Sequence, residues 1–231
     1  MINIGCEYNI KEDINFILET ERINSADLSE RTKVSRTTLD GIQKRGKARD
    51  DVCEKIYSYA YENKYRINSV KEELIKEKYQ NVLFHGSKYG LSEVTVGGSR
   101  DNCDFGKGFY LGETYSQALS FVCEKEKSSV YSFRYSLDNL NIKRINEIVA
   151  EIEASDVIVA PIADNKMFYV MAQFTDGEIN ADVALHSLSA SKLGLQFIFR
   201  TDKALQNLIP IERYYLSEPE REDCRKFLNE R

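Results

Sequence analysis

The sequence lacks a hydrophobic run of the roughly 18 residues that a membrane-spanning helix requires. Its amino terminus carries acidic and polar residues where a secretory signal peptide has a basic start and an apolar middle. Hydrophobic residues make up 42% of the chain and charged residues 30%, which is ordinary for a globular protein. We therefore expect a cytoplasmic protein that does not interact with membranes.

Cysteine and histidine are too few and too scattered for a disulfide scaffold or a zinc site. The five cysteines include no Cys-x-x-Cys pair, and their number is odd. The two histidines, His85 and His186, are far apart in the sequence. We expect buried or idle thiols and no metal cofactor.

The chain also lacks an excess of positive charge. Its net charge is −5, and residues 1–70 carry 12 basic and 12 acidic side chains. Neither this segment nor the acidic remainder is the basic surface that sequence-independent nucleic-acid binding requires.

Residues 9–66 show the apolar spacing of a small bundle of four helices. Its apolar positions, helix by helix, are Ile14, Phe16, Ile17 and Leu18, then Leu28, then Leu39 and Ile42, then Val52, Ile56, Tyr57 and Ala60. Ser25 and Ser35 precede the second and third helices, where a hydroxyl can accept a hydrogen bond from a free helix N–H. A charged linker helix over 71–80 would then separate a helical domain, residues 1–70, from the rest.

The two short helices joined near Lys33-Val34-Ser35 resemble the helix-turn-helix of phage-repressor-like regulators. In that family the second helix enters the major groove of DNA. The resemblance implies base contacts by Arg36, Thr37, Thr38 and Gln43, and phosphate contacts by Lys44, Arg45 and Lys47. Because the segment has no net charge, a protein-docking or dimerising role and plain structural support remain open.

From residue 81 the pattern changes to short strands mixed with helices. We predict strands over 82–84, 130–137, 156–160 and 195–199, and helices over 115–127, 165–175, 181–192 and from about 218. Thr114-Tyr115-Ser116-Gln117 matches a capping box, and Ser217 is expected to cap the last helix. The strand over 130–137 alternates in a way that predicts one covered face. The strands are not regularly separated by helices, which favours an α+β fold over a parallel doubly wound sheet.

Two motifs carry the functional signal, and they are His85-Gly86-Ser87 and Asp104-Phe105-Gly106-Lys107-Gly108-Phe109-Tyr110-Leu111-Gly112. The spacing of the glycines is one residue longer than in the dinucleotide-binding fingerprint. Lys107 is followed by glycine rather than by serine or threonine, which argues against a phosphate-binding P-loop. The Asp104-Phe105-Gly106 triplet is not preceded by a His-Arg-Asp catalytic loop, so a protein kinase is not expected.

Together with the flanking Leu83-Phe84 and Tyr115-Ser116-Gln117-Ala118, the motifs resemble the signature of poly(ADP-ribose) polymerases and diphtheria-toxin-like ADP-ribosyltransferases over roughly residues 82–201. Arg100, the glycine motif and Val159-Ala160-Pro161-Ile162-Ala163-Asp164 also look like a bacterial branch of uncharacterised relatives. The resemblance implies a split β-sheet domain over 81–231 with NAD+ as substrate. Cleavage of the nicotinamide–ribose bond passes through an oxocarbenium-like state, so such a site must hold the ring, fix the ribose hydroxyls and favour positive charge.

The resemblance also implies a role for each motif residue. His85 would hydrogen-bond a ribose hydroxyl, the backbone of Gly86 would hold the nicotinamide amide, and Ser87 would assist. Glycine at position 86 would let the backbone approach the ligand without a side chain in the way. Tyr110 would stack on the nicotinamide ring, with Gly108 in the wall of the pocket. Plainer roles remain open, with His85 ending a strand and Tyr110 in the core.

Gln196, in Leu195-Gln196-Phe197-Ile198-Phe199, stands where this family usually has glutamate. Glutamine can hydrogen-bond a hydroxyl but has no charge to offset an oxocarbenium, so we expect slow turnover and no chain elongation. Asp104, Asp156 and Asp164 are other acids that could supply the charge. Arg100 could grip a pyrophosphate bidentately, or be a solvated loop charge.

The expected function is a mono-ADP-ribosyltransferase that modifies a protein or nucleic-acid acceptor, in the manner of a toxin or a phage-defence effector. The helix-turn-helix module would regulate its gene, recruit it to DNA or bind a neutralising partner. Two alternatives remain open at this point. One is a non-catalytic sensor that binds NAD+ or ADP-ribose and acts through the module, and the other is an NAD+ glycohydrolase.

Overall fold

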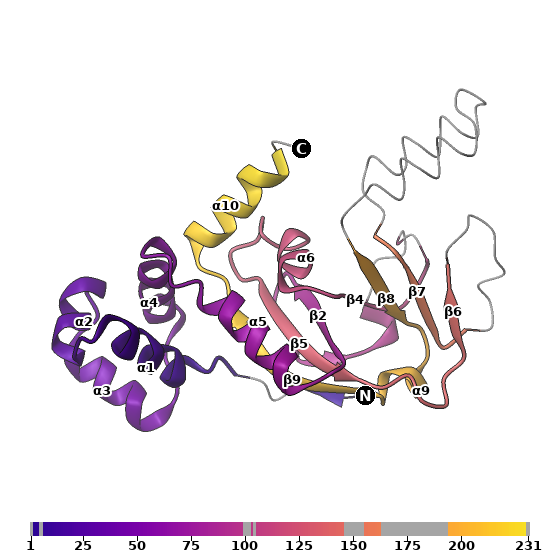
Figure 1. Ribbon diagram of the computed structural model, residues 1–231, viewed down its shortest axis with the longest axis horizontal. Helices are drawn as coiled ribbons and strands as arrows, with labels where there is room; N and C mark the ends of the chain where they lie inside the picture. Colours follow the sequence, from indigo (N-terminus) through magenta and orange to yellow (C-terminus); the bar gives the residue numbers. More distant parts are fainter. Residues whose placement is uncertain are drawn as a thin grey trace. The chain divides into compact units, whose positions relative to one another are not determined.

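The computed structural model describes residues 2–4, 7–98, 103, 105–145, 155–162 and 194–229. Its elements are β1 (Ile2–Asn3), α1 (Ile10–Glu21), α2 (Ser25–Thr32), α3 (Arg36–Arg45), α4 (Asp50–Glu62), α5 (Ile67–Lys78), β2 (Val82–Ser87), β3 (Glu93–Val94), η1 (Val96–Gly98), β4 (Phe109–Gly112), α6 (Tyr115–Ser120), β5 (Ser129–Tyr135), β6 (Ile142–Arg144), β7 (Val157–Pro161), β8 (Leu195–Phe199), α9 (Asp202–Leu205), β9 (Leu208–Tyr215) and α10 (Glu218–Asn229). N-terminal helices followed by mixed strands confirm the predicted α+β class (Figure 1). The helices predicted over 165–175 and 181–192 lie outside the described residues.

The chain divides into two compact units. The larger unit comprises residues 3–93, 114–136 and 208–231, and the smaller unit comprises residues 1–2, 94–113 and 137–207. Strands β2, β5 and β9 lie side by side in the larger unit, all antiparallel. The smaller unit has the order β6-β7-β8-β4, in which only the β6–β7 pair is parallel. The N-terminal helices thus belong to the same unit as β2, β5, β9 and α10, and a separately folding domain over 1–70 stays a prediction.

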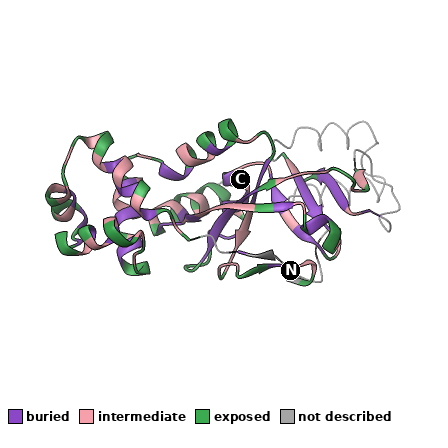
Figure 2. Ribbon diagram, turned by 90° about the horizontal axis from the view of Figure 1, so that it is seen from below, coloured by how far each residue is buried: buried purple, intermediate pink, exposed green. Residues whose placement is uncertain are grey.

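Helices α1 to α4 enclose an aliphatic core at the predicted positions. The buried members are Ile14, Ile17, Leu28, Leu39, Ile42, Val52, Ile56, Tyr57 and Ala60, with Phe16 and Leu18 partly buried beside them. In Figure 2 the buried colour follows the inner sides of these helices, and the exposed colour follows their outer sides. The 3.6-residue periodicity therefore located the core of this part of the chain correctly.

One of the two predicted caps in this region is confirmed. The Ser35 hydroxyl accepts a hydrogen bond from the Thr38 backbone N–H at 3.2 Å. The prediction at Ser25 was wrong by one residue, because Asn24 caps α2 and Ser25 is already helical. The Asn24 side chain accepts from two backbone N–H groups while Asp27 accepts from the Asn24 N–H, which completes a reciprocal capping box.

A buried ion-pair cluster joins these helices to β9 within the larger unit. Lys71 Nζ lies 2.9 Å from Asp13 Oδ2 and 2.6 Å from Glu212 Oε1. The Tyr57 hydroxyl also donates to Asp13. Burial alone would lower the pKa of Lys71, but the two carboxylates raise it above its ordinary value. Removing one member would leave a buried charge unpaired, so the cluster holds α1, α4, α5 and β9 together.

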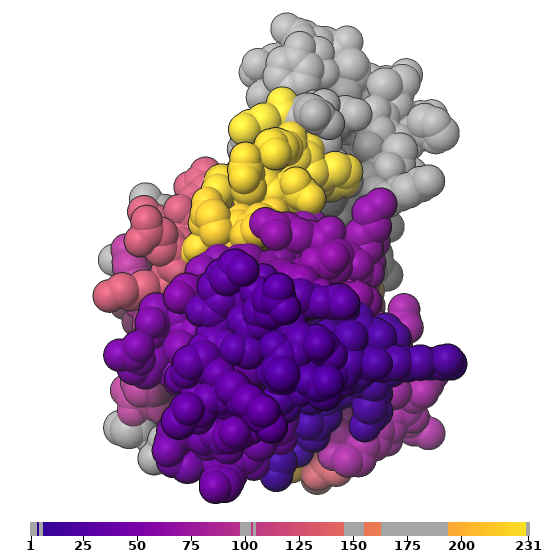
Figure 3. Space-filling view, turned by 90° about the vertical axis from the view of Figure 1, so that its left-hand side faces the viewer, coloured from indigo at the N-terminus to yellow at the C-terminus, as the bar shows by residue number. Residues whose placement is uncertain are grey.

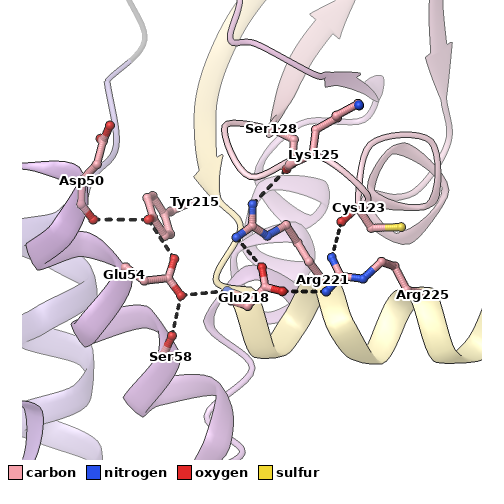
Figure 4. Close-up of polar contacts among 10 residues, drawn as sticks. All are labelled: Asp50, Glu54, Ser58, Cys123, Lys125, Ser128, Tyr215, Glu218, Arg221 and Arg225. Carbon is pink, nitrogen blue, oxygen red and sulfur yellow. Dashed lines mark hydrogen bonds and ion pairs between the residues drawn. The ribbon is translucent and has the colours of Figure 1, made fainter.

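Helix α10 begins against α4, as Figure 4 shows. Glu54 Oε1 accepts a hydrogen bond from the Glu218 backbone N–H at 2.8 Å, and the Tyr215 hydroxyl donates to Glu54 Oε2 at 3.0 Å. The predicted cap at Ser217 was wrong, because its buried hydroxyl has no hydrogen-bond partner among the described residues. A carboxylate from a helix more than 150 residues earlier in the chain caps α10 instead.

The same helix also contacts α6 and the turn that follows it. Arg221 Nη1 donates to the Lys125 carbonyl at 2.9 Å, and the Tyr115 hydroxyl donates to Glu220 Oε1 at 2.8 Å. Asn68 of α5 donates to the other oxygen of Glu220 at 2.9 Å. Burial raises the pKa of Glu220 to about 7, although both hydrogen bonds oppose this shift. Helix α6 is therefore held by α5 and α10 together.

Two predictions about strands and helices in the larger unit were wrong. Helix α6 ends at Ser120 rather than near residue 127, because the segment continues as turns with short-range backbone bonds such as Lys125 N to Val122 O. Strand β5 is buried on both faces rather than one. Val130 packs in the cluster that contains α6, and on the other face the Tyr131 hydroxyl accepts from the Leu91 N–H.

Within the described residues, no helix combines the length and the apolar character that crossing a lipid bilayer requires.

Candidate functional site

His85, Gly86 and Ser87 form the end of β2 in the larger unit. They pair with residues 131 to 129 of β5, and all three are partly buried. Because side chains alternate along a strand, His85 and Ser87 lie on one face and position 86 lies on the other. Only His85 and Ser87 can therefore offer side chains to a common pocket.

Gly86 faces helix α6 rather than open space. A Cβ atom at this position would lie 2.3 Å from the Ala118 carbonyl oxygen and 2.9 Å from Val122 Cγ1. The close approach of α6 accounts for the glycine without any ligand. The sequence-based reason for this glycine, access of a ligand to the backbone, is thus not needed to explain it.

The loop after the motif is fixed by its own polar contacts. Ser87 Oγ donates to the Gly90 carbonyl at 2.6 Å, and Gly90 has a positive φ of 81°. The next residue, Leu91, donates its N–H to the Tyr131 hydroxyl at 2.9 Å. Ser87 therefore shapes the loop beside His85, and its hydroxyl proton is already in use.

Tyr110 lies on β4 in the smaller unit and closes the glycine turn before it. Its hydroxyl accepts from the Phe105 N–H at 3.3 Å and donates to the Gly106 carbonyl at 2.7 Å. Gly106 has a positive φ of 73°, and its own N–H donates to the Cys103 carbonyl at 2.9 Å. The hydroxyl of Tyr110 thus fixes the glycine turn.

Gly108 and Tyr110 pack against β8. A Cβ at position 108 would lie 2.4 Å from Ile198 Cγ2 and 3.2 Å from the Phe199 carbonyl. The half-buried ring of Tyr110 packs against a small apolar cluster of Ile158, Ala160 and Ile198. Gly108 is therefore a packing position, and the ring of Tyr110 has one side on the sheet.

Gln196 lies on the same face as Tyr110. In the β4–β8 register Tyr110 pairs with Ile198 and Gly112 pairs with Gln196, which makes Tyr110 and Gln196 diagonal neighbours about 7 Å apart. Gln196 is only 8% exposed, and its Nε2 donates to the Pro161 carbonyl at 3.0 Å. The structure thus brings two of the three predicted catalytic residues together, while His85 belongs to the other unit.

Asp156 does not supply a charge beside Gln196. Its carboxylate accepts from the Asn141 N–H at 2.9 Å and from the Thr201 hydroxyl at 2.7 Å, and these bonds lower its pKa. It stands just before β7, whereas Gln196 pairs with Ala160 near the other end of that strand. Asp156 therefore links the segments at the end of β7 that is far from Gln196.

A different carboxylate, Glu113, lies at the same end of β8 as Gln196. Its Oε2 accepts from the Leu195 N–H at 2.8 Å. Sequence reasoning missed it, although its place directly after the glycine motif was a usable signal. Arg100, Asp104 and Asp164, the other predicted candidates, lie outside the described residues. Among the described residues, no group of three or more His, Cys, Asp or Glu could hold a metal ion.

Residues 81–209, which are more than half of the chain, match a family described as "Protein of unknown function (DUF3990)". The chain belongs to the DUF3990 family. The matched DUF3990 region contains both motifs and Gln196, and it leaves out helices α1 to α5 and α10. No curated protein and no solved structure gave a match.

Outside the DUF3990 region, α3 exposes some of the residues that were predicted to contact DNA. Arg36, Thr37 and Lys44 are exposed, on the N-terminal helices drawn in indigo in Figure 3. Gln43 instead donates its amide to Asn15 of α1 at 2.8 Å, because the two helices pack there. Its predicted role as a base contact is therefore weakened.

Two further residues that were predicted to contact DNA also have partners within the protein. The Thr38 hydroxyl is hydrogen-bonded to Ser35 at 2.7 Å, and Lys47 pairs with Glu7 at 2.6 Å. A groove of about 560 Å³ runs beside α3, and its lining consists of Thr37, Thr38, Ile42, Arg45, Lys47, Ala48, Arg49 and Val52. A lining that combines apolar residues with Arg45, Lys47 and Arg49 suits a protein segment as well as a phosphate backbone, so DNA contact and protein docking both stay predictions.

Tyr110→Phe separates the two uses of this side chain in the DUF3990 region. The variant keeps the aromatic ring but loses both hydrogen bonds of the hydroxyl, so we expect the free energy of unfolding to fall by about 1–2 kcal/mol. Urea titration followed by circular dichroism measures this change. NAD+ affinity, measured by calorimetry, should stay within about threefold of wild type, because stacking uses the ring alone. If Tyr110→Phe lost NAD+ affinity as completely as Tyr110→Ala, the stacking role would be contradicted.

Proposed function

We propose that the DUF3990 region is a mono-ADP-ribosyltransferase that cleaves NAD+ and transfers ADP-ribose to a macromolecular acceptor. The observation that carries the proposal is the placement of the Tyr110 ring and the Gln196 amide on one face of the β4–β8 pair. An aromatic face beside a buried amide suits a nicotinamide ring attached to a ribose. The resemblance of the His85 and glycine motifs to the transferases supports the same assignment.

In this mechanism the carbonyl oxygen of Gln196 faces the ribose. Nε2 already donates to Pro161, and among the described residues Oε1 has no hydrogen-bond partner. Oε1 would accept a hydrogen bond from a ribose hydroxyl and place its partial negative charge near the anomeric carbon. A neutral amide stabilises the cation less than a carboxylate does, which is consistent with slow transfer of a single ADP-ribose.

The reaction exchanges one bond at the anomeric carbon for another. The bond to the nicotinamide nitrogen breaks, and nicotinamide leaves as a neutral molecule with the electron pair. A nucleophilic atom of the acceptor forms the new bond to the same carbon and loses its proton. Tyr110 would hold the ring until it departs, and the resemblance to the transferases implies that His85 orients a ribose hydroxyl.

The test uses the full chain with NAD+ labelled in its adenosine part, together with cell extract. We expect release of nicotinamide and transfer of label to macromolecules, and we expect Gln196→Glu to raise the rate at least about tenfold, because it adds charge beside the cation. Gln206→Glu is the matched control, since Gln206 is an exposed residue at the end of α9 and should leave the rate unchanged.

Other outcomes identify the alternatives. Nicotinamide release without labelled acceptor would make the protein an NAD+ glycohydrolase. NAD+ binding without consumption, in wild type and in Gln196→Glu, would favour the sensor. Absence of both binding and cleavage would refute the proposal.

A further inference from the structure

Arg213 lies in the same row of side chains as His85. On the β2–β5 pair His85 is opposite Tyr131, and on the β5–β9 pair Tyr131 is opposite Arg213. Directly opposed residues share a face of the sheet, and two strand spacings separate the backbones of His85 and Arg213 by about 10 Å. The face that carries the His85 motif therefore also carries a guanidinium.

The guanidinium is held in one orientation. Nε and Nη2 both donate to Ser129 Oγ, at 3.2 and 3.0 Å, and Ser129 is the strand partner of Ser87. The Tyr8 ring centroid is 4.1 Å from the guanidinium carbon. A Cβ at Gly90 would lie 3.4 Å from Nη2, so the loop after the motif passes beside the charge. Nη1 makes none of these bonds.

Arg213 is partly buried, and no carboxylate lies within ion-pair distance of it among the described residues. Two cations of the larger unit with well-buried side chains do have such partners, since Lys71 contacts Asp13 and Arg221 contacts Glu218. A partly buried charge without a counter-ion is costly for a fold. A fixed guanidinium of this kind beside a ligand-binding motif fits an anionic ligand.

We propose that Arg213 binds the diphosphate of NAD+, an inference that rests on the proposed function. The diphosphate joins the two riboses of NAD+, and a planar guanidinium recognises such a group with strong, charge-assisted hydrogen bonds. His85 on β2 and Arg213 on β9 would then hold the ribose and the diphosphate of one molecule across β5. Arg213 lies beyond the segment that matches the family, which ends at residue 209.

Calorimetry with three ligands tests this role. NAD+ and ADP-ribose contain the diphosphate, and nicotinamide riboside lacks it. We expect Arg213→Gln to lower the affinity for NAD+ and ADP-ribose by about 10- to 100-fold, which is the range for a lost hydrogen bond to a charged group. The affinity for nicotinamide riboside should stay unchanged. Arg134→Gln is the matched control, because Arg134 is an exposed arginine on β5 that lies over Tyr79 and on the opposite face.

The possible results separate the two proposals. Equal NAD+ affinity of Arg213→Gln and wild type would overturn the diphosphate role and leave Arg213 as a tether for Tyr8. Failure of wild type to bind any of the three ligands would overturn the proposed function, and this inference with it. If Arg213→Gln does not fold, a measurement on the wild-type protein still tests the diphosphate role. In wild type, raised salt should weaken the binding of NAD+ but not the binding of nicotinamide riboside. An equal effect of salt on the two affinities would also overturn the diphosphate role.

Discussion

His85→Ala is expected to lower NAD+ cleavage by at least about 100-fold, because removing one preorganised hydrogen-bond donor from a charge-developing site has an effect of this size. The imidazole lies at the partly buried end of β2, on the face that also carries Ser87 and Arg213. Nicotinamide release by the purified variant measures the loss. Its thermal unfolding should stay within a few degrees of wild type, since no core side chain is removed.

Tyr89→Ala provides the control for this variant. Tyr89 is four residues from His85, in the loop that follows β2, and it is 78% exposed. Its removal should leave both the cleavage rate and the unfolding temperature unchanged. If His85→Ala unfolded far below wild type while the folded fraction still cleaved NAD+, His85 would be a strand-ending residue and not a ligand.

Gly86→Ala should destabilise the protein by about 3 kcal/mol, because the new methyl group meets backbone and not a movable side chain. The nearest atom, the Ala118 carbonyl oxygen, would lie 2.3 Å away, so α6 would have to shift. Helix α6 is held from behind by the hydrogen bond from Tyr115 to Glu220, which limits that shift. Denaturant titration of the full chain measures the change.

Gly97→Ala is the matched substitution. Position 97 lies in the short helix η1, and nothing lies within 4 Å of the added methyl group. Its stability should equal or slightly exceed that of wild type, because alanine restricts the unfolded chain. Equal stability of Gly86→Ala and Gly97→Ala would show that α6 yields easily, and the glycine would then need a ligand-based explanation.

Several residues that the sequence predicts to bind NAD+ also support the fold. Gly86 allows the close approach of α6, Ser87 holds the next loop by a hydrogen bond, and Tyr110 closes the glycine turn. Loss of activity in their variants therefore does not by itself identify a ligand contact. Gln196, whose Oε1 is unbonded among the described residues, and Arg213, which has no carboxylate partner there, are the more informative positions to vary.

The sequence alone determined the features that depend on neighbours a few residues apart. Apolar periodicity located the helical core around Ile14, Leu39 and Ile56, and short-range capping chemistry identified Ser35 and Thr114. The α+β class followed from the order of these local patterns. The motifs were also visible at this level, because each is contiguous.

Tertiary structure decided what depends on residues distant in the chain. Glu54 rather than Ser217 caps α10, and β5 is buried on both faces by segments on either side of it in sequence. Arg213 lies in the row of His85 only because three strands pair, and its hydrogen-bond partner Ser129 is 84 residues away in the sequence. No periodicity within a segment records such pairings, because they arise only when the folded chain brings those strands into register.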